Sequence, residues 1–96
     1  MLVVIKKSSN TKKKFEANII ENGNITRINF GAAGYEDYTI HKDPERKRRY
    51  IERHDGEDWS DPYKAGFWAK HLLWNKPTLE ESIDSLNNRW LRVLYI

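Results

Sequence analysis

The sequence contains no cysteine, and this absence excludes several kinds of structure and chemistry. Disulfide bonds, a thiolate nucleophile and a cysteine-ligated zinc site are all ruled out. The absence fits a reducing compartment. With 96 residues, the chain is expected to form one domain, residues 1–96, with a modest core and little stability to spare.

Long apolar runs are missing as well. No run approaches the roughly 20 residues that a membrane-spanning helix needs. The N-terminal stretch MLVVIKKSSN lacks the order of charge, apolar run and cleavage site that marks a signal peptide. We therefore expect no membrane partner, and a location inside a cell or inside a particle that is made in a cell.

The excess of positive charge is small, whereas aromatic residues are plentiful. The 17 lysines and arginines stand against 14 aspartates and glutamates, a formal net charge of +3. This balance permits an anionic partner without requiring one. The four tryptophans, five tyrosines and three phenylalanines can fill a small core or anchor an interface.

The clearest local pattern is a β-hairpin centred on Asn22 and Gly23, a pair that suits the positive φ angles of a type I′ turn. Counting outward from this turn pairs Ile20 with Ile25 and Phe15 with Phe30. The register places apolar residues on one face, which supports it. With a strand over residues 2–6, residues 1–31 are predicted to form a three-stranded antiparallel meander.

Three helix-start patterns predict helices over residues 44–53, 62–74 and 79–90. The first two begin with an aspartate followed by a proline, and the third begins with Thr78 and Glu81 in a capping box. The apolar residues of the third helix form one stripe, Leu79, Ile83, Leu86 and Trp90.

The predicted fold class is α+β, with a three-stranded antiparallel sheet covered on one face by about three helices. Residues 43–90 form its helical part. The apolar tail, residues 91–96, is expected to be extended and either to add a strand or to pack on a neighbour.

The most basic stretch, HKDPERKRRYIERH, lies in the first predicted helix. Its two interpretations are a helix that contacts phosphates and a solvated helix, in which Glu45 and Glu52 pair with Arg49 and Arg48. Lysines 6, 7 and 14 of the first loop would enlarge a basic patch on the same side. The candidate nucleic-acid-binding residues are Lys12, Lys13, Arg46, Arg49 and Arg53.

Aromatic residues of the second half have two interpretations. Phe67, His71 and Trp74 are expected on one face of the second helix, where they most simply cover the sheet. A partly exposed tryptophan would instead anchor a partner. The candidate protein-interface residues are Trp59, Trp68, Trp74, Tyr95 and Ile96.

The histidines offer little chemistry. His41, His54 and His71 have no spacing that would place two metal ligands on one helix face. A local set of His41, Asp43 and Glu45 leaves a small nuclease as a minor alternative. The sequence therefore predicts no catalytic residue, no metal site and no cofactor.

Two stretches, HKDPERK and LLWNKPTLEESI, resemble a family of small uncharacterised proteins of nucleocytoplasmic large DNA viruses. The resemblance runs from Phe30 to about Ile83 and includes the preceding KKFEANI, whereas MLVVI and WLRVLYI lie outside it. It implies a viral origin and a compact domain, and no activity comes with it.

These observations lead to a hypothesis of a non-enzymatic viral protein that acts through protein–protein contacts, as a virion structural or minor capsid component. Its partners would be other viral proteins, with an oligomer and DNA as further partners, in the virion or in the cytoplasm or nucleus of the infected host cell. The alternative is a basic nucleic-acid-binding protein that contacts phosphates through the Arg46–Arg53 helix.

Overall fold

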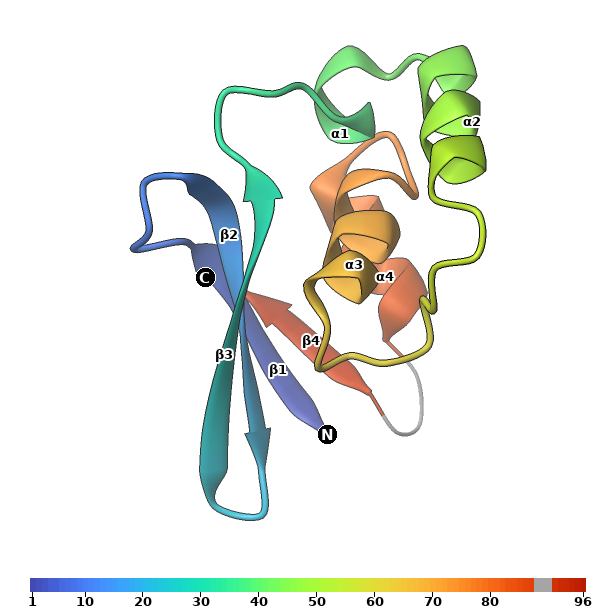
Figure 1. Ribbon diagram of the computed structural model, residues 1–96. Helices are drawn as coiled ribbons and strands as arrows, with labels where there is room; N and C mark the ends of the chain where they lie inside the picture. The colour runs from blue at the N-terminus through green and yellow to red at the C-terminus, as the bar shows by residue number, and fades with distance from the viewer. Residues whose placement is uncertain (88–90) are drawn as a thin grey trace.

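The computed structural model describes residues 1–87 and 91–96, and it confirms the α+β class. One sheet has helices packed on one of its faces, and the β2–β3 hairpin extends beyond them (Figure 1). The strands are β1 (Leu2–Lys7), β2 (Lys13–Glu21), β3 (Asn24–Ala32) and β4 (Arg92–Tyr95). The helical segments are α1 (Tyr38–His41), α2 (Pro44–Arg53), α3 (Ala65–Trp68), η1 (Ala69–Leu73) and α4 (Leu79–Leu86).

The hairpin agrees with its prediction in turn and in register. Asn22 and Gly23 have φ angles of 53° and 78°, as a type I′ turn requires. Ile20 pairs with Ile25, and the register continues outward as predicted to Phe15 and Phe30. β1 pairs antiparallel with β2, which completes the predicted meander.

The sheet has four strands, so the prediction of a three-stranded antiparallel sheet is wrong. β4 pairs parallel with β1, and the strand order is β3-β2-β1-β4. The tail joins the sheet because Leu91 and Val93 are almost completely buried there, and because β1 offers a free edge. On the outer edge of β4, the Asn87 side chain accepts a hydrogen bond from the Val93 N–H at 2.7 Å.

The first predicted helix is confirmed as α2. Asp43 caps it by accepting a hydrogen bond from the Glu45 N–H at 2.9 Å, and Pro44 occupies the first turn. A short helix, α1, precedes it and was not predicted. Asp37 caps α1 in the same way, with the Thr39 N–H as donor at 2.9 Å.

The second predicted helix begins later and is wound differently. Asp61 accepts a hydrogen bond from the Tyr63 N–H and forms a turn, so α3 starts only at Ala65. It continues as a π-helical turn, η1, in which the Trp74 N–H donates to the Ala69 carbonyl five residues earlier. The Phe67 and His71 rings contact each other at 4.4 Å between centroids, whereas the Trp74 ring stacks on Tyr50.

The third predicted helix is confirmed at its start. The Thr78 hydroxyl accepts from the Glu81 N–H at 3.1 Å, and α4 ends at Leu86. The predicted continuation of this helix to Trp90, and the place of Trp90 in the apolar stripe, lie outside the described residues.

The core lies between the sheet and the segments α3, η1 and α4. Trp68 is 0% exposed, and its indole N–H donates to the Pro62 carbonyl at 2.7 Å. The assignment of Trp68 to a protein interface is therefore wrong, because its whole surface is used inside the domain.

Within the described part of the chain, no helix is long and apolar enough to cross a membrane.

Candidate functional site

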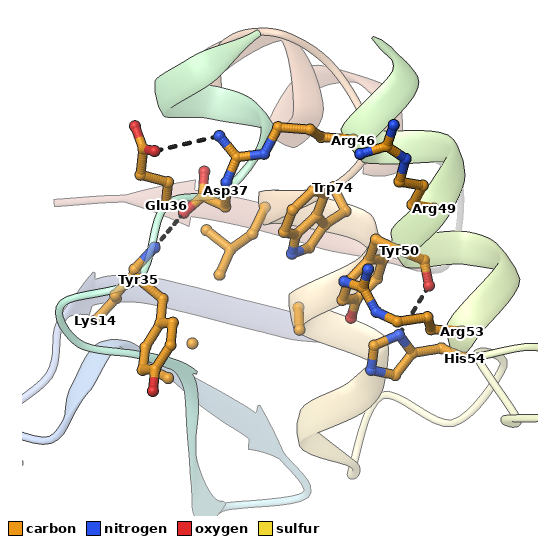
Figure 2. Close-up of a pocket in the computed structure, with 14 residues that line it drawn as sticks. Lys14, Tyr35, Glu36, Asp37, Arg46, Arg49, Tyr50, Arg53, His54 and Trp74 are labelled. Carbon is orange, nitrogen blue, oxygen red and sulfur yellow. Dashed lines mark hydrogen bonds and ion pairs between the residues drawn. The ribbon is translucent and has the colours of Figure 1, made fainter. Parts of the chain in front are cut away.

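A groove of about 580 Å³ lies between α2 and the connection that leads from β3 to α1. We call it the arginine groove. Figure 2 shows Arg46, Arg49 and Arg53 on its α2 side, with Tyr35 and Glu36 on the opposite side. Its floor comes from the end of β3 and from η1, so it forms only when the two halves of the domain pack together.

The α2 wall is the face that the sequence predicted. Arg46, Arg49 and Arg53 are spaced three and four residues apart, and all three line the groove together with Tyr50. The Arg46 and Arg49 side chains are 42% and 61% exposed. Arg53 is exposed and has no ion pair with any residue that the structure describes. This wall can therefore present guanidinium groups to a ligand.

The outer face of α2 is different because its charges neutralise one another. Arg48 pairs with Glu45, and it also pairs with Glu52 at 2.7 Å. Glu45 lies 3.9 Å from Arg49 as well. The hydrogen bond from Arg48 lowers the pKa of Glu45. The interpretation as a solvated, self-neutralised helix thus fits the outer face of α2.

The wall opposite α2 is held in place by Asp37, a carboxylate that is only 2% exposed. The Lys14 ammonium lies 2.6 Å from this carboxylate, which also caps α1. The neighbouring Glu36 pairs with Arg46 at 3.2 Å across the groove. Sequence reasoning missed this wall, although the Asp37–Thr39 spacing is typical of a helix cap.

Aromatic rings form the floor beneath the arginines. The Tyr50 and Trp74 rings are stacked with 4.4 Å between centroids and 3° between planes. The His54 ring lies 4.1 Å from the Tyr50 ring, and its Nδ1–H donates to the Tyr50 carbonyl at 2.8 Å. Burial raises the pKa of Tyr50 to about 12. Trp74, a predicted interface residue, is half-buried here.

A glycine lets the floor approach β3 closely. Gly31 has a φ of +78°, and a Cβ atom at this position would lie 2.8 Å from Cδ1 of Leu73. An L-residue would therefore be strained in its backbone and would also push Leu73 out of place. Glycine at position 31 keeps η1, and with it Trp74, against the end of the sheet.

The structure separates the remaining predicted residues. Lys13 lines a second groove together with Lys7, while Lys12 is exposed in the β1–β2 loop and lines neither groove. Trp59 packs beside η1, where the Lys70 ammonium lies 5.5 Å from its ring. Tyr95 and Ile96 are 52% and 77% exposed.

The residues of the nuclease alternative form contacts at the start of α2, while His41 Nε2 is buried without a hydrogen-bond partner among the described residues. His41 Nδ1 accepts a hydrogen bond from the Asp43 N–H at 2.9 Å, and the Asp43 carboxylate caps α2. The other two histidines donate hydrogen bonds to backbone carbonyls. His54 donates to Tyr50, and His71 Nε2–H donates to the Trp59 carbonyl at 3.0 Å. Within residues 1–87 and 91–96, no three histidine or carboxylate groups are close enough to hold a metal ion.

Comparison with protein families gives one match. A family described as a family of unknown function (DUF5754) matches residues 3–54, which is more than half of the chain. The matched region starts in β1 and reaches the end of α2, so it includes both walls of the arginine groove. Searches among curated proteins and among solved structures gave no match.

Proposed function

The chain belongs to this family of unknown function, and from that premise we propose that it binds nucleic acid by holding phosphates in the arginine groove. The observation that carries the proposal is the row of Arg46, Arg49 and Arg53 along one wall of a concave surface. Guanidinium groups bind phosphate oxygens through pairs of N–H donors. Such contacts give affinity with little sequence preference.

The charges that line the groove also favour an anion. Of the residues that the structure describes, four lysine and arginine side chains line it, against the two carboxylates of Glu36 and Asp37. The Asp37 carboxylate forms an ion pair with Lys14, and the exposed Glu36 carboxylate forms one with Arg46. Exposed ion pairs are worth between about 0 and 1 kcal/mol, so a phosphate can replace Glu36 on Arg46 at little cost.

The test titrates a fluorescently labelled oligonucleotide of about 30 nucleotides with the protein. Binding is measured by fluorescence anisotropy at about 50 and about 200 mM salt. We expect salt-sensitive binding. The triple variant Arg46→Ala, Arg49→Ala, Arg53→Ala should lose affinity, and its slope of log affinity against log salt should fall by about 2 to 3.

A matched control removes three charges elsewhere. Arg48, Lys64 and Lys76 are exposed and line neither groove, so their replacement by alanine makes the same change in net charge. This variant should keep most of the affinity. Equal losses in both triple variants, or an unchanged salt slope in the groove variant, would refute the arginine groove as the phosphate site.

A second candidate function is a structural or minor capsid role in a virus particle, supported by the exposed apolar end of β4. Leu94, Tyr95 and Ile96 are consecutive and are 41%, 52% and 77% exposed. Exposed apolar residues at a sheet edge are typical of an interaction surface. The viral origin is proposed from the resemblance of residues 30–83, with other viral proteins as partners and the virion or infected cell as location.

Two measurements test this second candidate. The replacement of Leu94 and Ile96 by serine should weaken an association that sedimentation velocity detects in the unmodified chain. Mass spectrometry of purified particles should find the protein among their components. A chain that stays monomeric and is missing from the particles would exclude a structural role.

A further inference from the structure

We infer that the bound nucleic acid is single-stranded and that it passes from the arginine groove over the ring of Tyr35 into the second groove. The inference rests on the proposed function, and it specifies the form and the path of the ligand. Three features carry it: the continuity of the two grooves, the exposure of Tyr35, and the composition of the second groove.

The second groove has a volume of about 750 Å³ and adjoins the first. Both grooves are lined by Lys14 and by Tyr35, Glu36 and Asp37. The exposed residues Tyr35 and Glu36 therefore form a ridge between the two grooves, with the buried Asp37 at its base. An extended ligand that leaves the arginine groove on this side must cross the ridge.

Tyr35 stands on this ridge and is 73% exposed. Among the described residues, its ring has no aromatic neighbour and its hydroxyl has no hydrogen-bond partner. The segment that carries it is anchored two residues later, because Asp37 is buried against Lys14 and caps α1. An exposed aromatic ring with a free face, carried on an anchored segment of backbone, is a stacking platform for a base.

The second groove combines cations on its rim with apolar walls. Lys7 and Lys13 are exposed on the rim, and among the residues that the structure describes the carboxylates that line this groove are those of Glu36 and Asp37. Phe15, Ile40 and Tyr95 line its walls, and the Phe15 and Tyr95 rings meet edge to face at 6.1 Å. Lysines beside aromatic rings suit a strand whose phosphates and bases are both accessible.

This composition favours a single strand over a duplex. The bases of a duplex are stacked on one another and hide their faces, so Tyr35 could reach them only at an end or a break. In a single strand each base has a free face, and stacking on an aromatic side chain contributes about 1–3 kcal/mol per base. The alternative ligand for the ridge is a protein, and the experiments below distinguish a protein ligand from a single strand.

The first experiment compares Tyr35→Ala with Tyr35→Phe. Binding is measured with a fluorescently labelled single-stranded oligonucleotide and with a duplex of equal length. We expect the alanine variant to lose about tenfold in affinity for the single strand, because one stacked base is lost. The phenylalanine variant should bind like the unmodified chain, because the ring remains. The salt slope should not change in either variant, because Tyr35 carries no charge.

A second experiment tests the path with oligonucleotides of about 4 and about 12 nucleotides, a range that spans known site sizes on comparable surfaces. The double variant Lys7→Ala, Lys13→Ala should weaken binding of the 12-mer by about threefold or more and leave the 4-mer nearly unchanged. The matched control, Lys64→Ala with Lys76→Ala, removes two exposed charges outside both grooves and should affect neither length.

The outcomes separate this inference from the function on which it rests. If Tyr35→Ala binds normally while the triple arginine variant loses binding, the path is wrong and the proposed function stands. Duplex binding as tight as single-strand binding, or an equal effect of the lysine variant on both lengths, would also overturn the inference. If no oligonucleotide binds, both fail, and a self-association lost in Tyr35→Ala would make the ridge a protein contact.

Discussion

The two faces of α2 carry the same kind of residue in opposite environments. On the outer face, Arg48 forms ion pairs with both Glu45 and Glu52. On the groove face, Arg46 and Arg49 have one carboxylate neighbour each, and Arg53 has none among the described residues. Tyr50 on this face is buried against Trp74. The difference shows that a run of basic residues is not one feature, because the tertiary contacts of each face decide which charges remain available.

The largest expected difference between the faces concerns stability. Tyr50→Ala should lower the free energy of unfolding by about 3 kcal/mol, because it removes a buried ring from its stack with Trp74. Arg48→Ala should have no measurable effect, since its ion pairs are exposed. Urea unfolding measures both. Similar losses in the two variants would mean that the faces are equivalent.

The next difference is a dependence on pH that only the groove face should show. The pKa of Tyr50 is about 12 in the folded chain, against an ordinary value of 10. The neutral phenol therefore stabilises the fold fully below about pH 10, and this contribution is lost as the pH rises toward 12. Because pH 11 is still below the folded pKa, and allowing for partial hydration of the hydroxyl, we expect a loss of about 1 kcal/mol between about pH 9 and about pH 11.

The measurement is urea unfolding at about pH 9 and about pH 11 in the unmodified chain and in Tyr50→Phe. Phenylalanine keeps the stack but has no ionisable group, so its stability should fall less over this interval. Other titrating groups affect both proteins equally. Parallel loss of stability in the two proteins would contradict the assignment to Tyr50.

The smallest expected effect comes from a residue at the start of α2, which supports the helix as a whole and belongs to neither face. Asp43 caps α2, so Asp43→Ala should lower the free energy of unfolding by about 1 kcal/mol. Because the cap does not touch the arginine wall, oligonucleotide affinity should stay close to that of the unmodified chain. Asp43→Asn, which keeps a cap oxygen, is the control. A large loss of affinity in the alanine variant alone would tie the groove to the helix start.

Part of the fold could be predicted because its causes are local. The Asn22–Gly23 turn determines the register of the hairpin, and the Asp43–Pro44 start determines α2. The arginine face of α2 follows from helical spacing alone. The same local logic failed at Asp61, whose side chain forms a turn and leaves the helix to begin at Ala65.

The parts that were missed depend on contacts between distant residues. The sequence left two alternatives open for the tail, and it adds a fourth strand because β1 had an unpaired edge and the core had room for Leu91 and Val93. Trp68 was assigned to an interface, yet the packed core encloses it completely. The wall formed by Tyr35, Glu36 and Asp37 faces α2 only after η1 and the sheet have placed both.

The sequence by itself determined the α+β class, the hairpin register and the face of α2 on which three arginines lie, since each depends on residues close together in the chain. Tertiary structure alone decided that this face lines a groove, that the outer face neutralises itself, and that Tyr35 stands on a ridge between two grooves. The physical reason is that turns, caps and helical spacing act over a few residues, whereas a concave surface requires segments far apart in the chain to pack together.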